Sequence, residues 1–384
     1  MSIEKTKQKR IAIVGAGVAG MALAILATKK GYQVSLYERN SDISSLGAGV
    51  TLWSNAMFVL QQMGLENDIN RVAGRPHFMR QFNQDGAKLA ELDIEDVNRL
   101  SGYPSVSILR RDLMRILANS LEHLGVHIQF NASITLQDID ALKQEYELVV
   151  GADGRMNSVV RQSLFMDKDS DRAMPCYQGF INIIGISHMP ERKMGNAIQD
   201  FRGNNERFGI VPVKAGLYYW AAGWQSPLVK DKSLSVCYEE MHSRFQHWPD
   251  PVIKVLESYD KNSLNHIFVH DLNPLPHWHQ DNVLIIGDAA HAPLPTSGQG
   301  ACQALEDAWH LVQCMGKHNE LDKVLSDFYQ MRIDKTTAAQ RVGRQVAKSI
   351  FATSSSDDNK VGATGISAQQ LSAFWMQGLD TKKG

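Results

Sequence analysis

The pattern of apolar and polar positions divides the chain into two kinds of segment. The continuous apolar run at 11–14 predicts a buried strand, the apolar-rich segment 18–30 a helix, and the segment 33–37 a second strand. Together these elements form a β-α-β unit, which is typical of a nucleotide-binding fold. The same reasoning predicts further short strands at 148–150 and 283–286, and helices at 110–124, 300–315 and 325–348, the last as one or two helices.

Two other regions, 76–100 and 166–270, are polar and alternating or rich in aromatic residues, which favours short strands of a mixed sheet. In the second region, the segments 208–213 and 217–224 predict a hairpin around the three-residue loop Lys214-Ala215-Gly216. Its register pairs Val211 with Tyr219 and places on one face Arg207, Gly209, Tyr219 and Ala221. The opposite face carries aromatic residues that we expect in the core or an interface, namely Tyr218, Trp220 and Trp224.

The end of the chain has a different character. Ser354–Gly365 is polar and contains serine and glycine, which predicts a loop. The tail then predicts a short amphipathic helix with these residues on one side: Leu371, Phe374, Trp375 and Leu379.

Composition limits the class of protein. A chain of 384 residues exceeds what one core usually serves, so we expect two domains or one domain with a large insertion. Lys and Arg total 40 against 41 for Asp and Glu, without charge runs, so no nucleic-acid partner is expected. The spacing of the four cysteines predicts neither a metal site nor a disulfide framework. Basic residues before Ile11 imitate a secretory leader, but the glycines that follow argue against one, so we expect a cytoplasmic protein without a membrane span.

A glycine-rich turn between the first predicted strand and helix carries the first chemical signal. In this G-x-G-x-x-G motif, Gly15 permits a tight turn, Gly17 lets a pyrophosphate approach the backbone, and Gly20 lets the helix pack against the strand. The helix N-terminus then faces the phosphates. Glu38 ends the next strand and can accept hydrogen bonds from a ribose, and its neighbour Arg39 is a further candidate contact. The unit predicts a bound dinucleotide.

A second motif far downstream identifies the dinucleotide. The strand at 283–286 is followed by the sequence GDAAHAPLPTSGQG and a helix. This segment resembles the class A flavoprotein monooxygenases, whose Asp at this place lies on the ribityl chain of FAD. The matching positions are Asp288, His291, Pro295, Gly298, Gln299 and Gly300. A helix beginning near Gly298 would direct its N–H groups at the pyrimidine edge of the flavin, where the reduced ring carries negative charge.

Other residues of this segment have expected roles as well. Pro293, Leu294 and Pro295 are expected to form an apolar wall beside the flavin. We expect His291 to pack and form hydrogen bonds inside the turn rather than to transfer a proton.

The third matching motif, Gly151-Ala152-Asp153-Gly154-Arg155, follows the predicted strand at 148–150. The resemblance implies that it serves the flavin and nicotinamide pyrophosphates, with Asp153 supporting the backbone. It also implies a cofactor contact for Arg110, at a helix start. A second G-x-G-x-x-G unit is absent, so the resemblance implies that NADH or NADPH binds transiently, without a domain of its own.

The substrate residues are less well defined by the sequence. The resemblance is closest to the urate hydroxylase and 6-hydroxynicotinate 3-monooxygenase branch, and it implies that Arg207 and Tyr219 act at the substrate. Two positions depart from these patterns. Thr296 stands where urate hydroxylases carry Asp, and Thr51 stands where hydroxynicotinate enzymes carry His. Neither substrate is therefore assigned.

The resemblance implies an α/β fold like that of para-hydroxybenzoate hydroxylase. We expect a Rossmann-like FAD-binding domain formed by 1–75, 101–165 and 271–340. An inserted β-sheet domain for the substrate is expected at 76–100 and 166–270, and a C-terminal helical segment at 341–384.

The implied activity is hydroxylation of a small aromatic or heteroaromatic substrate with NAD(P)H and O2, through a C4a-hydroperoxyflavin, by a monomer or homodimer. Two alternatives stay open, namely a related oxygenase for epoxidation or antibiotic modification, and a non-catalytic flavin-binding redox sensor.

Overall fold

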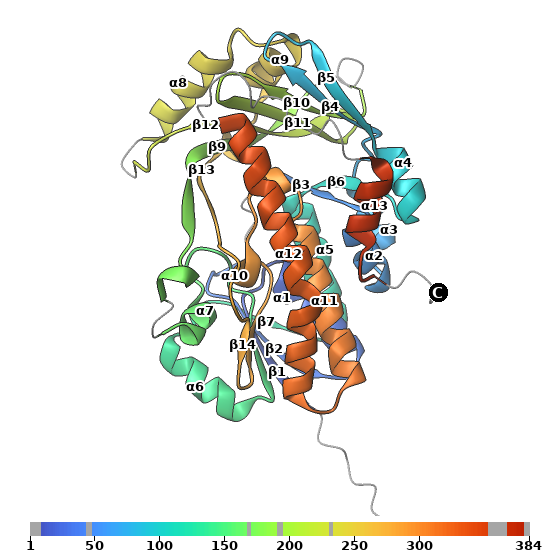
Figure 1. The fold of residues 1–384 in the computed structure, drawn as a ribbon, viewed down its shortest axis with the longest axis vertical. Coiled ribbons are helices and arrows are strands. Elements are labelled where there is room, and N and C mark those ends of the chain that lie inside the picture. Colours follow the sequence, from blue (N-terminus) through green and yellow to red (C-terminus); the bar gives the residue numbers. More distant parts are fainter. Residues whose placement is uncertain are drawn as a thin grey trace, which may run out of the picture.

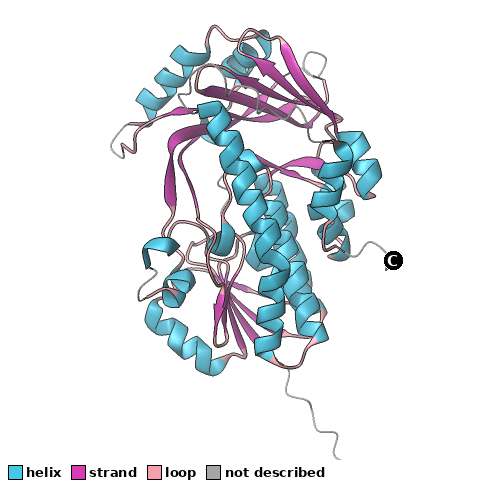
Figure 2. Ribbon diagram, viewed as in Figure 1, coloured by secondary structure: helices cyan, strands magenta, loops and turns pink. Residues whose placement is uncertain are grey.

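The computed structural model describes residues 9–43, 48–166, 170–189, 195–229, 233–351 and 367–379. Two sheets lie at opposite ends of the molecule, and the long helix α12 (Leu321–Phe351) runs from one toward the other (Figure 1). Figure 2 shows that helices cover both sheets. The predicted loop Ser354–Gly365 lies outside the described residues. No helix in the described ranges is long and apolar enough to cross a membrane.

The first sheet is the predicted nucleotide-binding sheet. Its order is β14-β15-β8-β1-β2-β7, and all its pairs are parallel except β14 with β15. The strands are His279–Gln280, Val283–Ile285, Leu148–Gly151, Arg10–Val14, Gln33–Tyr37 and Ile128–Gln129. β1 and β8 are central and almost wholly buried, which explains their continuous apolar sequences.

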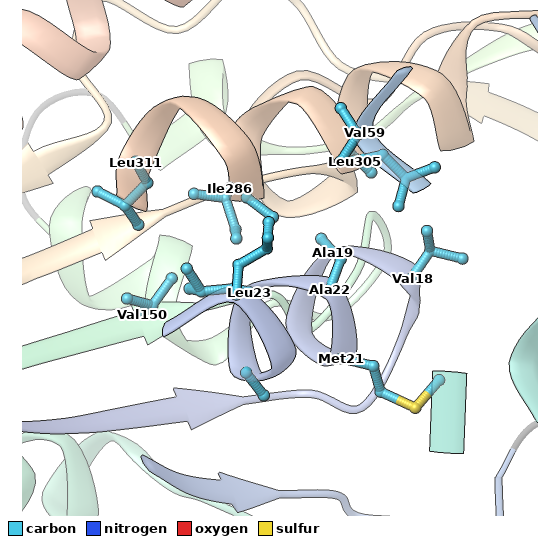
Figure 3. Packing of buried hydrophobic residues seen from close by; sticks show 14 of the residues in the cluster. Val18, Ala19, Met21, Ala22, Leu23, Val59, Val150, Ile286, Leu305 and Leu311 are labelled. Carbon is cyan, nitrogen blue, oxygen red and sulfur yellow. The ribbon is translucent and has the colours of Figure 1, made fainter. Parts of the chain in front are cut away.

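Helix α1 (Val18–Lys29) lies between this sheet and helix α11 (Gly300–Lys317), and every residue from 18 to 27 is buried. A helix that is buried on every side is expected to carry apolar residues on every side, and residues 18–27 of α1 do so. In Figure 3, Leu23 of α1 lies among side chains from the strands and from α11, including Val150, Ile286 and Leu311.

The second sheet has the order β13-β9-β12-β11-β10-β4-β5, and its pairs are antiparallel except β10 with β4. The strands are Asn265–Asp271, Cys176–His188, Leu217–Gln225, Glu206–Lys214, Ala197–Arg202, Phe78–Asn83 and Lys88–Asp93. The predicted pairing of Val211 with Tyr219 is confirmed. The predicted three-residue loop is wrong, because Lys214 pairs with Leu217 and an irregularity before Lys214 absorbs the extra residue.

The two faces of the second sheet pack against different parts of the protein. The outer face packs Tyr218, Trp220 and Trp224 against helices α8 (Leu234–Phe245) and α9 (Asp250–Ser258), so these aromatic residues belong to the core as expected. The inner face approaches the short antiparallel pair β3 and β6, formed by Gly49–Leu52 and Val106–Leu109.

Several helices were not predicted. The segment at 94–101 forms α4 (Ile94–Ser101), because Asp93 caps the helix by accepting from the N–H of Asp96, and Gly102 ends it with φ of 77°. Helices α8 and α9 lie within the region expected to be sheet. Their moderately apolar faces cover only the outer face of that sheet.

At the C-terminal end, α12 is one continuous helix that crosses the expected boundary at residue 340. The predicted tail helix is α13 (Ala368–Met376), with Trp375 and Leu379 buried. The remaining helices are α2 (Ser54–Gln62), α3 (Glu66–Val72), α5 (Arg110–His123), α6 (Leu136–Glu145), α7 (Val159–Leu164) and α10 (Asp288–His291).

The packing of α1 yields a stability prediction. A Cβ atom at Gly20 would lie 1.9 Å from the carbonyl oxygen of Gly15, whereas one at Gly316 in α11 would meet nothing within 4 Å. We expect Gly20→Ala to lower the free energy of unfolding by about 3 kcal/mol through overpacking. Gly316→Ala is the matched control and should raise it by about 0.5–1 kcal/mol, because alanine favours helices. Chemical denaturation measures both, and equal effects would contradict the packing argument.

Candidate functional site

The three predicted motifs meet at the carboxyl edge of the first sheet. They follow β1, β8 and β15, which are adjacent strands. A Cβ atom on Gly15 would lie 2.4 Å from the carbonyl oxygen of Ala152, so the first two turns are in direct contact. The N–H of Ile286 donates to the carbonyl of Gly151 at 2.9 Å, and a Cβ atom on Gly287 would lie 2.8 Å from that of Ala19. Segments far apart in the sequence therefore form one site.

The glycine-rich turn has the geometry expected from its spacing. Gly15 has φ of 105°, a conformation that only glycine adopts readily. Gly17 differs from Gly15 and Gly20, because the nearest atom to an added Cβ there is 4.0 Å away and space remains beside the turn. The Glu38 carboxylate accepts from the N–H of Ala16 at 2.9 Å, so it lies at this turn, whereas Arg39 is exposed.

Asp153 acts on its own loop. Its carboxylate accepts from the Ser158 hydroxyl at 2.5 Å and from the N–H groups of Val159 and Val160 at the start of α7. The buried Arg161 donates to the carbonyls of Arg155 and Ala289, at 2.5 and 2.9 Å, and so joins the second motif to the third. These contacts place Asp153 as a support of the backbone.

Charged side chains face one another beside these turns. Burial lowers the pKa of Arg110, and the nearby Asp288 carboxylate acts in the opposite direction. The Nε atoms of Arg110 and Arg155 are buried and have no hydrogen-bond partner among the described residues. Buried donors without partners are costly, so both guanidinium groups fit an acceptor that the protein itself does not supply.

The loop before α11 contains glycine, and hydrogen bonds hold its backbone. Gly298 has φ of 63°, and its carbonyl oxygen accepts from Trp53 Nε1 at 3.0 Å. The N–H of Gln299 donates to the Ser297 hydroxyl at 3.1 Å. Helix α11 then begins at Gly300, beside Asp288.

The residues of the expected apolar wall differ in burial. Pro295 is exposed, but the Leu294 side chain is buried in a cluster between α12 and the second sheet, with Phe180, Val269 and Phe351. Leu294 turns inward because Gly343 of α12 leaves room for it. The expectation that Leu294 belongs to an apolar wall beside the flavin stays a prediction, and the structure shows its side chain buried in this cluster.

A buried ionic cluster lies beneath this loop. Arg332 of α12 donates to Glu306 at 2.6 Å and to Asp307 at 2.7 Å, and all three side chains are completely buried. Asp307 also accepts from the N–H of Gly287 at 2.7 Å and from His291 Nε2 at 2.6 Å. His291 thus packs and forms a hydrogen bond inside the turn, in line with the role expected from the sequence.

The charges in this cluster depend on one another. Burial alone would raise the pKa of Asp307, but His291 and Arg332 outweigh it and lower the pKa to about 2. The folded-state pKa thus lies below the ordinary value of 3.8. The ionised carboxylate therefore stabilises the fold above that value, and this contribution is lost as the pH falls toward 2.

On the inner face of the second sheet, Tyr219 reaches the short pair β3 and β6. Its hydroxyl shares a hydrogen bond of 2.9 Å with the hydroxyl of Thr51 on β3. Burial raises the pKa of Tyr219 to about 12, although Thr51 and Arg207 lower it somewhat, so the phenol is protonated at neutral pH. A Cβ atom on Gly49 would overlap the Tyr219 ring at 2.1 Å, so glycine is required there.

Arg207 lies on the same face as Tyr219, as predicted, and is held by a residue that the sequence did not reveal. The fully buried Asp200 binds the Nε of Arg207 with one oxygen and Arg202 Nε with the other, the latter at 2.8 Å. Two cations against one carboxylate leave a positive charge at this place. Thr296 lies elsewhere, because its hydroxyl donates to the carbonyl of Gly343 at 2.6 Å.

Comparison with known proteins decides the family. The model of the "FAD binding domain" family matches residues 8–332, most of the chain. The protein belongs to this family. This match and the relatives described below confirm the predicted FAD cofactor and the predicted family resemblance. They also confirm the enzyme class, an FAD-dependent monooxygenase.

Two curated relatives match over nearly the whole chain. The aurachin C monooxygenase/isomerase of Stigmatella aurantiaca is 26% identical, over 85% of this chain and 85% of the relative. The 6-hydroxynicotinate 3-monooxygenase of Pseudomonas fluorescens is 26% identical, over 88% and 91%. Among solved structures, Klebsiella pneumoniae HpxO complexed with FAD and uric acid has a TM-score of 0.78 and 20% identity, over 90% of this chain and 89% of HpxO. The predicted fold is confirmed by this likeness.

The residues of the flavoprotein site fit FAD. Space beside Gly17 and the unpartnered Nε atoms of Arg110 and Arg155 suit an anionic pyrophosphate, and Glu38 lies where a ribose hydroxyl would donate.

Sequence reasoning missed residues that act through other residues. Trp53, Asn55 and Asp200 lie outside the recognised motifs, and only their tertiary contacts reveal them. The ion pairs of Arg332 with Glu306 and Asp307 likewise join α12 to α11 and carry no local signal in the sequence.

The ionic cluster gives a testable prediction. We expect Arg332→Met to lower the free energy of unfolding by about 3–5 kcal/mol at neutral pH, because the two buried carboxylates lose the cation that they share and keep only His291 and Lys335. The loss of stability should shrink as the pH falls and these carboxylates take up protons. Arg71→Met is the control, since Arg71 pairs with Asp68 at the surface and should contribute less than about 1 kcal/mol. Urea unfolding at several pH values measures both variants, and similar losses would refute the importance of the cluster.

Proposed function

We propose that this flavoprotein hydroxylates a small aromatic or heteroaromatic substrate, using O2 and NADH or NADPH. The observation that carries the proposal is the meeting of three motif turns at one sheet edge, together with Tyr219 and Arg207 on the sheet face that contacts β3. Bound FAD would supply hydride acceptance and oxygen activation. The names of relatives, a hydroxynicotinate monooxygenase and a protein solved with uric acid, support a heteroaromatic ring.

The cofactor residues divide by role. Gly15 and Gly20 shape the turn, while Gly17 leaves room for the pyrophosphate, and Glu38 would accept from the ribose. Arg110 would balance the phosphate charge.

Around the ring, Asp288 would accept from the ribityl chain, and Asp153 acts as a support of its loop. The start of α11 would stabilise negative charge on the reduced flavin, with contributions from Pro295, Gly298, Gln299 and Gly300. Arg39 is exposed and would contact only the outer part of the nucleotide.

The side chains proposed to contact the substrate favour an aromatic ring that can lose a proton. Tyr219 is protonated and next to Thr51, and the pKa of the neighbouring Cys302 thiol is raised to about 12 by burial, so none of these groups is a base at neutral pH. The positive charge at Arg207 instead favours a substrate that carries or develops negative charge. Loss of a proton makes such a ring electron-rich and reactive toward electrophilic oxygen.

The activity can be tested with the purified holoprotein. A thermal-shift screen of heteroaromatic acids, purines and phenols should identify ligands that raise the unfolding temperature. A ligand that is a substrate should stimulate NAD(P)H oxidation and O2 uptake and gain one oxygen atom by mass spectrometry. Rapid NAD(P)H oxidation without an oxygenated product, for every ligand that binds, would instead support an oxidase or a redox sensor.

The role of Tyr219 has its own test. With a substrate found in this way, Tyr219→Phe should lower kcat/KM about tenfold, the loss of one hydrogen-bond donor to a charged group, without changing the affinity for FAD. Tyr218→Phe is the control, because its side chain lies on the opposite face of the sheet. Unchanged kcat/KM in Tyr219→Phe, measured by oxygen consumption, would remove Tyr219 from the substrate site.

A further inference from the structure

The C-terminal helix α13 lies beyond the residues matched by the family, and intermediate side chains connect it to the loop before α11, here called the flavin loop. The match ends at residue 332, and α13 begins at Ala368. Helix α13 packs against α2 and α4, on the side of the molecule where β3 and β6 reach the second sheet (Figure 1). Two chains of contact lead from it to the successive residues Gly298 and Gln299.

The first chain runs through two tryptophans. The ring of Trp375 stacks on the ring of Trp53, with centroids 4.5 Å apart, and both side chains are buried. Trp53 Nε1 donates to the carbonyl oxygen of Gly298 at 3.0 Å. The indole of Trp53 is therefore held on one side by α13 and holds the loop on the other.

The second chain runs through charges. Lys335 Nζ donates to the carbonyls of Trp375 and Gln377 at the end of α13, at 2.7 and 2.9 Å, and to Glu306 at 2.9 Å. Glu306 accepts from Asn55 Nδ2 at 2.6 Å, and the same Nδ2 lies 3.0 Å from Gln299 Oε1. The end of α13 is thus connected to the Gln299 side chain through three buried polar residues.

The loop needs such contacts because its own sequence does not rigidify it. Gly298 and Gly300 have more backbone freedom than other residues, and Gly298 occupies the left-handed region. A Cβ atom at Gly298 would lie 3.1 Å from Trp53 Nε1, so the close approach of the indole also depends on this glycine. Fixing the carbonyl of Gly298 fixes the peptide plane that leads into the first turn of α11.

We propose that Trp53 and Trp375 are positioning residues for the flavin, through which α13 sets the place of the α11 N-terminus relative to the ring. The inference rests on the proposed function, since it assumes that the N-terminal N–H groups of α11 face the flavin. Movement of this helix end weakens the stabilisation of the anionic reduced flavin and so lowers its midpoint potential.

The test compares full-length point variants. Trp53→Phe keeps an aromatic ring against Trp375 but removes the N–H donor to Gly298. We expect it to raise the Kd for FAD about three- to tenfold, the loss of one hydrogen bond, and to lower the midpoint potential of the bound flavin. Trp375→Leu removes the stacking partner and should act in the same direction. Fluorescence titration of the deflavinated protein and spectroelectrochemistry measure these quantities.

Trp309→Phe is the matched control. Trp309 lies on α11 beyond its first two turns and packs edge-to-face on Phe58, so the Kd and the potential of this variant should equal those of the wild type. The unfolding temperature of deflavinated Trp53→Phe should also stay close to that of the wild type. Wild-type Kd and potential in Trp53→Phe, or equal changes in Trp309→Phe, would overturn the positioning role. Failure of the wild type to bind FAD would overturn the proposed function itself, and the inference with it.

Discussion

The close approach of three backbone turns at the carboxyl edge of the parallel sheet is the constraint on which the rest of the structure depends. Gly15 touches the backbone of Ala152, Gly20 touches Gly15, and Gly287 touches Ala19. At these contacts any side chain would push the turns apart. Because the turns are this close, the N-terminus of α1 and the ends of β8 and β15 border a single site, although they are far apart in the sequence.

Around that constraint the protein uses buried charge to hold the flexible parts. Next to the loop before α11, Asp307 accepts from the N–H of Gly287, and Glu306 is connected to Gln299 through Asn55. Arg332 of α12 balances both carboxylates. A buried ion pair gives little net stability compared with apolar packing, but a missing partner is costly, so the cluster favours one arrangement of the elements. The same reasoning applies to Asp200, which is buried and holds Arg207 and Arg202 toward the inner face of the second sheet.

The side of the site proposed for the substrate lies where the pair β3 and β6 meets the second sheet. Thr51 on β3 and Tyr219 on β12 come from different sheets and share a hydrogen bond, and Gly49 makes room for the Tyr219 ring. Both departures from the related substrate patterns are explained locally. Thr51 is a partner of Tyr219, and Thr296 is a partner of the α12 backbone.

The sequence by itself determined the nucleotide-binding unit, the family and the hairpin register that puts Arg207 and Tyr219 on one face. These features follow from local rules, since glycine spacing, apolar periodicity and strand alternation each act over a few residues. It did not reveal α4, α8 and α9, whose short apolar faces resemble those of strands, or the two-residue loop at Ala215 and Gly216. Only the tertiary structure decided that Leu294 turns inward, that Asp200 binds Arg207, and that Trp53 and Lys335 connect α13 to the flavin loop. These contacts join residues far apart in the chain, and hydrogen bonds and ion pairs across such distances depend on how the elements pack rather than on any local pattern.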